Sequence, residues 1–356
     1  MQEPINRQIE SISKSITIKD IAKKAGVSIG TVDRALHDRG RISAETKKKV
    51  LDAIEELGYQ PNKFAQSLRK QKEIRILALF QEEPQTYSVH FVNGFREMQE
   101  DLSNYGVHLD ILRARTLGPA DMANVFETID FENYDGILLN AGGPELDRYI
   151  DFVIEKGIAV ATFNSDAPSS SRLFFVGENH YCAGRLAGEL TAKLLKGKGT
   201  VSFFSGLETV YALSERTRGF RDVIKEYYPD VQIINEISHY DNLAIREEKA
   251  EELLFGGQMP DAVFCNTALG AFPVCQLLKR SKVKSRPIVI GYDEDEALEK
   301  MVKEGYCTAI MHQHPERQAR NALRFIFEYI YYNHRMPLQE ETRIMPTIVM
   351  RENLRL

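Results

Sequence analysis

The feature that most constrains this fold is a regular alternation of short apolar runs and amphipathic segments, which begins at Ile74 and continues almost to the C-terminus. The apolar runs have the length of buried strands, and apolar residues recur at helical spacing in the segments between them. Such βαβ alternation predicts parallel sheets with helices on both faces. The expected strands span 74–80, 107–112, 136–140, 159–163, 200–205, 231–237, 262–266, 288–292 and 308–311, and the helices between them include 92–105, 183–196, 214–227 and 315–331.

Nine strands exceed what one sheet holds comfortably, so two similar lobes are expected within residues 74–356. We expect the first lobe to contain residues 74–165 and 313–340, and the second to contain 166–312 and 341–356.

In parallel sheets of this kind, ligands bind beyond the carboxyl ends of the strands. Polar residues follow several of the expected strands, which favours a ligand cleft at these ends, although loops are polar in any case. These residues are Asn140, Asn164, Asp166, Asn266, Asp293 and Gln313.

The residues before Ile74 follow a different, helical pattern. Apolar residues between Ile18 and Ala25 recur at helical spacing. Gly26-Val27-Ser28 then forms a turn, in which Ser28 is suited to cap a second helix over 29–37. Ser43 is placed to cap a third helix that runs to about Leu57. We therefore expect a small all-α helix-turn-helix domain over 16–60, preceded by a flexible polar extension over 1–15.

The segment from Pro61 to Arg69 is compatible with about two helical turns and leads into a polar linker that ends at Glu73. An isolated helix shorter than ~12 residues is marginal in water. We therefore expect residues 61–73 to form a helix and linker whose helical part is stable only against a partner.

Charge is distributed unevenly along the chain. Residues 1–72 hold 15 Lys and Arg against 9 Asp and Glu, whereas the remainder holds 31 against 42. A basic module on an acidic body suits phosphate binding by the N-terminal part alone. A merely solvated surface is the alternative that charge by itself leaves open.

Several function classes find no support in the sequence. No apolar run approaches the ~18 residues of a membrane span, and the N-terminal residues lack a secretory signal pattern, so we expect a cytoplasmic protein without membrane contact. The four cysteines show no metal or disulfide spacing and are expected to be reduced. No convergent set of nucleophile, acid/base pair or metal ligands indicates catalysis, so we expect no enzyme, metal or cofactor.

The residues described so far resemble the lactose-repressor (LacI/GalR) family of bacterial regulators, strongly up to Arg69 and more loosely afterwards. The motif that carries this resemblance is long and ordered, which makes it far more specific than a helix-turn-helix alone. The resemblance implies a DNA-binding first domain and a body that is a two-lobed, periplasmic-binding-protein-like (type I) α/β domain closing over a ligand. The motif includes Ile18-Lys-Asp20-Ile21-Ala22, Ala25-Gly26-Val27-Ser28, Thr31-Val32, Arg34, Leu57-Gly58-Tyr59, Pro61-Asn62 and Ala65-Gln-Ser67-Leu68.

In helix-turn-helix proteins the second helix enters the major groove with its N-terminal residues against the base edges. Arg34 is the best base reader, because a guanidinium can bond the O6 and N7 of guanine; a phosphate contact is the alternative. Gly30 and Asp33 depart from the usual family pattern, and Asp33 either accepts from a cytosine or pairs with Arg34, so the operator sequence stays open. The expected DNA-binding residues are Thr17, Ser28, Ile29, Gly30, Thr31, Asp33, Arg34, His37, Tyr59, Asn62, Ala65 and Leu68.

By the same resemblance, residues 61–69 are the hinge helix, which orders against its two-fold mate in the minor groove of DNA. Leu68 would be the apolar wedge inserted at the central base step. The alternative is that Leu68 and Phe64 simply cover the body. Paired hinge helices and a pseudo-palindromic operator imply a homodimer.

The resemblance also carries ligand-binding roles onto the body, where Arg216 matches the arginine that clamps ligand hydroxyls or a carboxylate. Asn164-Ser165 lacks the Asp-Arg pair of some sugar-binding relatives, so furanoses, polyols and acidic sugars stay open beside pyranoses. Tyr87, Phe91 and Tyr240 either stack on a sugar ring or belong to the core. Besides Arg216 and these aromatics, the expected ligand-binding residues are Asn140, Asn164, Asp166, Asn266, Asp293 and Gln313, whose amides and carboxylates suit vicinal hydroxyls.

Together these expectations describe a cytoplasmic, homodimeric, sequence-specific DNA-binding transcription regulator, by resemblance a repressor. A small sugar-like or polyol ligand is expected to control its operator affinity. The alternatives are control by a protein partner and, less favoured, an exported solute-binding receptor, which would carry a signal sequence and lack residues 18–69. The sequence leaves the effector, the operator and the sign of the response open.

Overall fold

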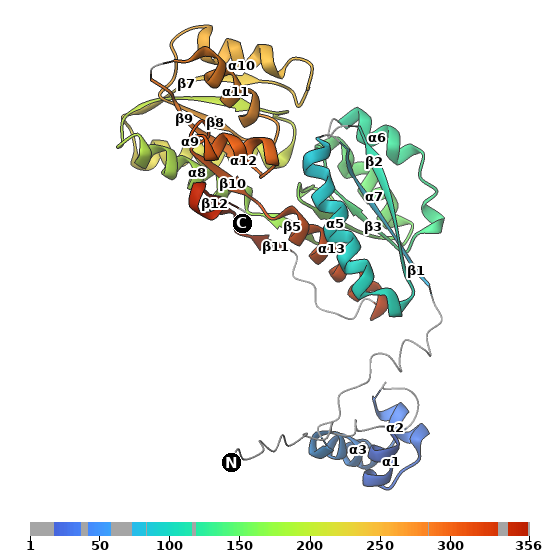
Figure 1. The fold of residues 1–356 in the computed structure, drawn as a ribbon. Helices are drawn as coiled ribbons and strands as arrows, with labels where there is room; N and C mark the ends of the chain where they lie inside the picture. The colour runs from blue at the N-terminus through green and yellow to red at the C-terminus, as the bar shows by residue number, and fades with distance from the viewer. Residues whose placement is uncertain are drawn as a thin grey trace, which may run out of the picture. The chain divides into compact units, whose positions relative to one another are not determined.

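The structure of the protein is a computed structural model that describes residues 18–36, 42–57, 73–82, 84–115, 119–283, 285–333 and 341–354. The chain divides into two compact units between Gln71 and Lys72, and each unit is treated by itself below (Figure 1). No helix in these ranges combines the length and the apolar character needed to cross a membrane.

The described residues of the N-terminal unit form three helices, α1 (Ile18–Ala25), α2 (Ile29–Leu36) and α3 (Ala44–Leu57). Gly26 adopts φ +66° directly after α1, a left-handed conformation that glycine takes readily at a helix end. The helices share one small core, which contains Ile21, Ala22, Val32, Ala35, Val50 and Ala53.

Serine side chains cap the second and third of these helices, as the sequence predicted. The Ser28 hydroxyl accepts a hydrogen bond from the Thr31 backbone N–H at 3.2 Å, and the Ser43 hydroxyl accepts one from the Thr46 N–H at 3.2 Å. Each cap satisfies a donor that the first turn of a helix leaves unpaired. The helix-turn-helix therefore follows from local sequence signals.

The first lobe of the C-terminal unit is a three-layer sandwich around a sheet in the order β11-β5-β4-β3-β1-β2, in which every pairing is parallel. Helices α5 (Gln85–Asp101) and α13 (Pro315–Tyr331) cover one face, and α6 (Pro119–Glu127) and α7 (Asp147–Glu155) cover the other (Figure 1). The strands are β1 (Ile74–Gln81), β2 (Val107–Ala114), β3 (Gly136–Leu139), β4 (Ala159–Phe163), β5 (Phe175–Glu178) and β11 (Glu341–Ile344).

Burial on both faces explains why the central strands β3 and β4 are almost entirely apolar. Along β1, Ala78 and Phe80 pack against the α5 and α13 side, whereas Leu77 and Leu79 pack against the α6 and α7 side.

The second lobe repeats this design with the strand order β12-β10-β9-β8-β6-β7. Its pairings are parallel except for β12, which runs antiparallel to β10. One face carries α8 (His180–Leu194) and α9 (Tyr211–Tyr227), and the other carries α10 (Arg246–Phe255), α11 (Ala271–Ser281) and α12 (Glu296–Lys303). The strands are β6 (Gly199–Ser205), β7 (Val231–Ser238), β8 (Ala262–Cys265), β9 (Ile288–Tyr292), β10 (Ala309–His312) and β12 (Thr347–Val349).

All nine predicted strands are present, but three short strands, β5, β11 and β12, escaped the sequence analysis. Strands β5 and β11 pair with each other in the first sheet. The prediction that residues 166–178 and 341–344 belong to the second lobe is therefore wrong. Runs of three or four residues are too short to show the apolar periodicity of a strand.

The corrected boundaries mean that the chain passes between the lobes three times. The passages lie between β5 and α8, between β10 and α13, and between β11 and β12. Residues close to these passages can therefore contact both lobes.

Two glycines allow α8 and α9 to pack closely in the second lobe. A Cβ atom built on Gly184 would lie 2.0 Å from the backbone oxygen of Arg216, and one built on Gly219 would lie 2.1 Å from the backbone oxygen of Tyr181. These backbone atoms cannot rotate away as the end of a side chain could. Gly184 therefore fixes how near α9, and Arg216 with it, lies to α8.

We expect Gly184→Ala to destabilise the protein by ~1–3 kcal/mol, the usual cost of forcing extra volume into a packed site. Urea denaturation of the purified variant measures this cost. Gly257→Ala is the matched control, because nothing lies within 4 Å of a Cβ built there. Equal stability of the two variants would contradict the packing argument.

Candidate functional site

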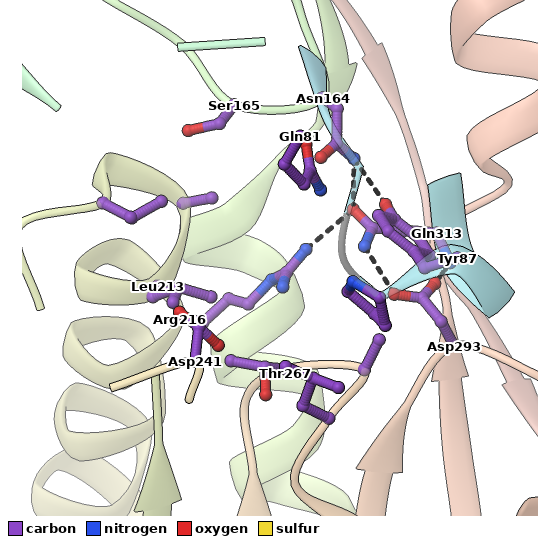
Figure 2. A pocket seen from close by; sticks show the side chains of 15 residues that line it. Gln81, Tyr87, Asn164, Ser165, Leu213, Arg216, Asp241, Thr267, Asp293 and Gln313 are labelled. Carbon is purple, nitrogen blue, oxygen red and sulfur yellow. Dashed lines mark hydrogen bonds between the residues drawn. The ribbon is translucent and has the colours of Figure 1, made fainter. Parts of the chain in front are cut away.

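A cleft with about 610 Å³ of space, part of it open to solvent, lies where strands of both lobes end. Figure 2 shows its side chains converging from segments far apart in the sequence. Five of the predicted ligand-binding residues line it: Tyr87, Asn164, Arg216, Asp293 and Gln313. The remaining lining residues are Gln81, Pro84, Ser165, Val210, Ala212, Leu213, Asp241, Thr267, Ala268 and Leu269.

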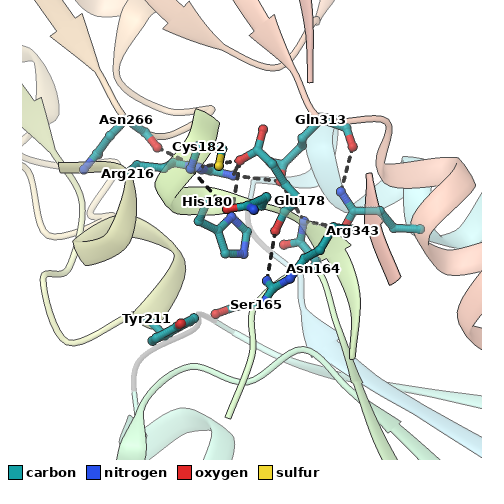
Figure 3. A network of polar contacts seen from close by, with 12 residues as sticks. Asn164, Ser165, Glu178, His180, Cys182, Tyr211, Arg216, Asn266, Gln313 and Arg343 are labelled. Carbon is teal, nitrogen blue, oxygen red and sulfur yellow. Dashed lines mark hydrogen bonds and ion pairs between the residues drawn. The ribbon is translucent and has the colours of Figure 1, made fainter. Parts of the chain in front are cut away.

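Arg216, on α9, is the centre of the polar network (Figure 3). Its Nε and Nη2 atoms each lie 2.9 Å from Oε2 of Glu178, at the end of β5 in the other lobe. Its Nη1 donates to the backbone oxygen of Asn266 at 3.0 Å, and Nη2 donates to Oε1 of Gln313 at 2.8 Å. The guanidinium carbon lies 3.9 Å from the centre of the Tyr292 ring. Every nitrogen of this side chain therefore has a protein partner.

Gln313 joins the two lobes from the passage between β10 and α13. Its Nε2 donates to Oδ2 of Asp293 at 2.7 Å, and its Oε1 accepts from Nδ2 of Asn164 at 3.0 Å. Asn164 Nδ2 also lies 2.8 Å from the Tyr87 hydroxyl oxygen. The chain of contacts thus runs from the first lobe through Gln313 into the second (Figure 2).

Asn164 and Asp293 occupy matching positions, each immediately after a central strand of its sheet. Both have left-handed backbones, with φ +62° and +56°. Asn and Asp tolerate this conformation better than other residues with a side chain. The local turn therefore favours these two residue types at the same points where their side chains enter the cleft.

Burial raises the pKa of Asp293 to about 7, although Arg216 and the hydrogen bond from Gln313 lower it in part. This carboxyl group therefore changes charge near neutral pH.

A second carboxylate, Asp241, enters the cleft after β7. Its backbone N–H donates to Nδ1 of His239 at 3.2 Å, which assigns the ring proton to Nε2, 3.2 Å from the Thr267 hydroxyl oxygen. Burial lowers the pKa of His239 to about 4, so the ring is neutral at pH 7. Thr267 accepts from this ring, and its own hydroxyl proton is therefore available to the cleft that it lines.

Two predicted ligand-binding residues belong to the interior instead. Phe91 is fully buried in an aromatic cluster, with its ring centre 5.1 Å from those of Tyr87 and Phe163. The side chain of Asp166 is held by Arg172, whose Nη2 donates to its Oδ2 at 2.7 Å. Neither residue lines the cleft.

Three further predicted residues lie beside or outside the cleft. Asn140 supports lining residues from behind, by donating to Gln81 and by accepting from the Ser165 backbone N–H. The Asn266 side chain bonds the Gly206 N–H and Thr217, so its contribution to the cleft wall is the carbonyl that holds Arg216. Tyr240 is 58% exposed and is not among the lining residues.

The sequence analysis missed Glu178, Gln81, Ser165, Asp241 and Thr267. Gln81 and Thr267 lie at or just after strand ends, the same signal that selected Asn164 and Asp293. Glu178 lacked that signal, because its strand was not predicted. The apolar side of the cleft, which contains Val210, Ala212, Leu213, Ala268 and Leu269, had no recognisable pattern.

In the N-terminal unit, the start of α2 presents an accessible face. Ser28, Ile29 and Gly30 are exposed, whereas Val32 and Ala35 are buried against the other helices. The Thr31 hydroxyl lies 2.9 Å from the Ser28 hydroxyl. The side chains of Asp33 and Arg34, and the predicted residues Thr17, His37, Tyr59, Asn62, Ala65 and Leu68, lie outside what the structure describes.

Comparison with known families assigns both units. Residues 17–62 match the family described as bacterial regulatory proteins, lacI family, and residues 79–332 match the periplasmic binding protein domain. Residues 79–332 therefore belong to the periplasmic binding protein domain family, and the chain carries a lacI-family helix-turn-helix region in front of them. This confirms the resemblance and the fold class that the sequence predicted.

Similar curated proteins are transcriptional repressors. The chain is 27% identical over 287 residues to the probable HTH-type transcriptional repressor ExuR of Bacillus subtilis, covering 78% of this chain and 82% of that protein. It is 27% identical over 281 residues to the ribose operon repressor of the same organism (78% and 81%). It is 26% identical over 346 residues to the HTH-type transcriptional repressor PurR of Mannheimia succiniciproducens (95% and 98%).

Solved structures with the same fold include transport proteins. A solute-binding protein from Burkholderia graminis in complex with D-arabinose aligns with TM-score 0.73 and 21% identity, covering 79% of this chain and 96% of that one. The glucose-galactose binding protein GanP of Geobacillus stearothermophilus aligns with TM-score 0.73 and 24% identity (80% and 100%).

The titration of Asp293 predicts how stability depends on pH. Its pKa is about 7 in the folded protein against 3.8 for the group in water, so between about pH 4 and 7 the folded state holds a proton that the unfolded state has released. Asp293 therefore makes the protein less stable as pH rises through this range. We expect the free energy of unfolding of the wild type, relative to Asp293→Asn, to fall from pH 5 to 7 and then to level off.

Urea denaturation at a series of pH values measures this difference. Asp230→Asn, which removes an exposed carboxylate from the same lobe, is the control and should not reproduce the trend. Parallel pH profiles for the wild type and Asp293→Asn would rule out the assigned titration.

Proposed function

We propose that this chain is a cytoplasmic, homodimeric transcription repressor whose operator affinity is controlled by a small sugar-like or polyol ligand in the cleft between the lobes. The observation that carries the proposal is the polar network through Arg216, Gln313 and Asn164. It joins both lobes and lines the cleft, so a ligand there contacts groups on both sides.

The chemistry of the cleft favours a ligand with several hydroxyl groups. Amides and carboxylates line it, and a hydroxyl can both donate to and accept from such a set. The buried Ser165 hydroxyl has no hydrogen-bond partner among the described residues, a state that costs free energy unless a ligand or water satisfies it. Leu213 and Leu269 offer apolar surface for the C–H face of a sugar.

The relatives support the same ligand class. They include the ribose operon repressor of Bacillus subtilis and the sucrose operon repressor of Pediococcus pentosaceus. Proteins with the same fold have been solved with D-arabinose and with D-allose.

For DNA binding, we propose that the exposed start of α2 enters the major groove. Arg34 reads a base there, and Thr31 with the amides of the first turn contacts phosphate. Leu68 acts as the minor-groove wedge of the hinge segment. Two copies of the chain then read the two halves of a pseudo-palindromic operator.

Ligand control follows from the way the lobes are connected. Three passages of the chain link the lobes, so a ligand that fits one lobe arrangement better shifts the population toward it. In this proposal the shift moves the start of β1, which directly follows residues 61–73. These residues include the hinge segment. The hinge segment is marginal as a helix by itself, so a small shift is enough to favour or oppose its formation.

We expect Arg216→Ala to abolish the ligand response while operator binding without ligand is retained. Removing one partner of a buried ion pair costs ~3–5 kcal/mol, so Arg216→Lys is tested beside it. Lysine keeps the charge but cannot bond Glu178, Asn266 and Gln313 together. Fluorescence anisotropy with an operator duplex, with and without ligand, measures the response.

Arg218→Ala is the matched control for this pair of variants. Arg218 lies two residues after Arg216 on α9. Its side chain is half exposed and pairs with Glu215 outside the cleft. A normal ligand response in a folded Arg216→Lys protein would show that the contacts of Arg216 are not needed for the ligand response.

We expect Arg34→Ala to weaken binding to the selected operator by ~1–3 kcal/mol and to relax the sequence preference at one base pair in each half-site. In-vitro selection from random duplexes identifies the operator, and its repetition with the variant measures the preference. Arg280→Ala, which removes one positive charge from α11 in the other unit, is the control. An unchanged preference with uniformly weaker binding would indicate a phosphate contact instead.

A further inference from the structure

The charges around the cleft are unbalanced in a way that selects among sugar-like ligands. Of the residues that line it, Arg216 is the one cation, whereas Asp241 and Asp293 carry carboxyl groups, of which Asp293, with a pKa of about 7, is charged above neutral pH. A third carboxylate, Glu178, is fully buried behind Arg216. The described wall therefore carries more acidic than basic groups.

The single cation is also unavailable to an incoming anion. Its Nε and Nη2 atoms each lie 2.9 Å from Glu178 Oε2, Nη2 also donates to Gln313, and Nη1 donates to the Asn266 carbonyl. One face of the guanidinium is covered by the Tyr292 ring. A ligand carboxylate or phosphate could bond Arg216 in the usual two-pronged way only by displacing existing partners. On the Nε and Nη2 side it would displace Glu178 and leave that carboxylate buried without its charge partner, and on the Nη1 and Nη2 side it would break the bonds to Asn266 and Gln313.

The remaining groups suit an uncharged ligand that both donates and accepts. The Asp293 carboxylate accepts from Gln313, and Asp241 accepts from the Leu207 N–H, yet each carboxylate has room for further donors. Thr267 has a hydroxyl proton directed away from His239, and the Ser165 hydroxyl has no partner in the described structure. Sugar hydroxyls can satisfy both kinds of group at once.

We propose that the cleft selects uncharged polyhydroxy compounds and rejects their carboxylated and phosphorylated counterparts. This inference rests on the proposed function, which places a small ligand in the cleft. It narrows the ligand class by excluding the acidic sugars that the sequence had left open. Rejection follows from two acidic side chains that face the ligand and from one arginine already neutralised by Glu178.

The test is a charge-matched panel applied to the full-length protein. D-ribose, D-glucose, D-galactose, D-fructose and sorbitol are each compared with their carboxylated and phosphorylated counterparts by thermal shift and isothermal titration calorimetry at pH 8, where the Asp293 carboxyl group is charged. We expect at least one neutral compound to bind, and its charged counterparts to bind at least about tenfold more weakly, as like charges a few ångströms apart require.

Asp241→Asn tests whether the charge of the cleft wall, and not its shape, selects the ligand. The substitution removes one negative charge from the wall and preserves the size of the side chain. The affinity ratio between the neutral compound and its carboxylated counterpart should shrink in this variant, and Asp230→Asn, on the surface of the same lobe, should leave it unchanged. An unchanged ratio in Asp241→Asn would show that the wall charge does not select the ligand.

The outcomes distinguish this inference from the proposal beneath it. Tighter binding of a carboxylated or phosphorylated compound than of its neutral counterpart would overturn the inference, and ligand control would stand. Absence of binding by every compound, with operator binding intact, would overturn both the inference and the small-ligand part of the proposed function.

Discussion

The buried ion pair between Arg216 and Glu178 is the contact on which the arrangement of the body depends. Removing two charges from water is costly, and the cost is recovered only when geometry and additional hydrogen bonds are good. Here the guanidinium gains the Asn266 carbonyl and Gln313, while Glu178 also lies 3.2 Å from Nδ1 of His180. Because the two charges come from different lobes, any movement that separates the lobes at this point exposes or unpairs them. The pair therefore favours a small number of well-defined lobe arrangements over a continuous range.

The backbone around the pair is built to hold it in place. Glu178 ends β5 directly before the first passage between the lobes, and Gln313 follows β10 at the second. Gly184 lets α8 approach the backbone of Arg216 so closely that no side chain fits between them. The ion pair, two of the passages and the helix contact therefore lie next to one another, and a ligand of the proposed kind that displaced one of them would affect the others.

The sequence predicted the fold well because the fold depends on local and periodic signals. Strand alternation, the caps at Ser28 and Ser43 and the polar residues after strands are all visible in the chain itself. It predicted the cleft less well, because a residue type says nothing about its partners. Asp166 follows a strand as Asp293 follows another, yet Arg172 binds it in the interior, and that pairing depends on three-dimensional contacts. Glu178 was missed for a related reason: its strand of four residues exists only because neighbouring strands pair with it.

Under the proposed function, the same network would join ligand recognition and switching in one equilibrium. The polar groups of the cleft bond one another across the lobes, with Gln313 linking Arg216, Asp293 and Asn164. A ligand hydroxyl that reaches Asp293 or Asn164 competes with these internal bonds, so binding must change the contacts that set the lobe arrangement. The free energy gained from the ligand is then divided between holding the ligand and shifting the lobes. Asp293 makes this division sensitive to pH, since its charge changes near pH 7 and a carboxylate accepts from a hydroxyl more strongly than a carboxylic acid does.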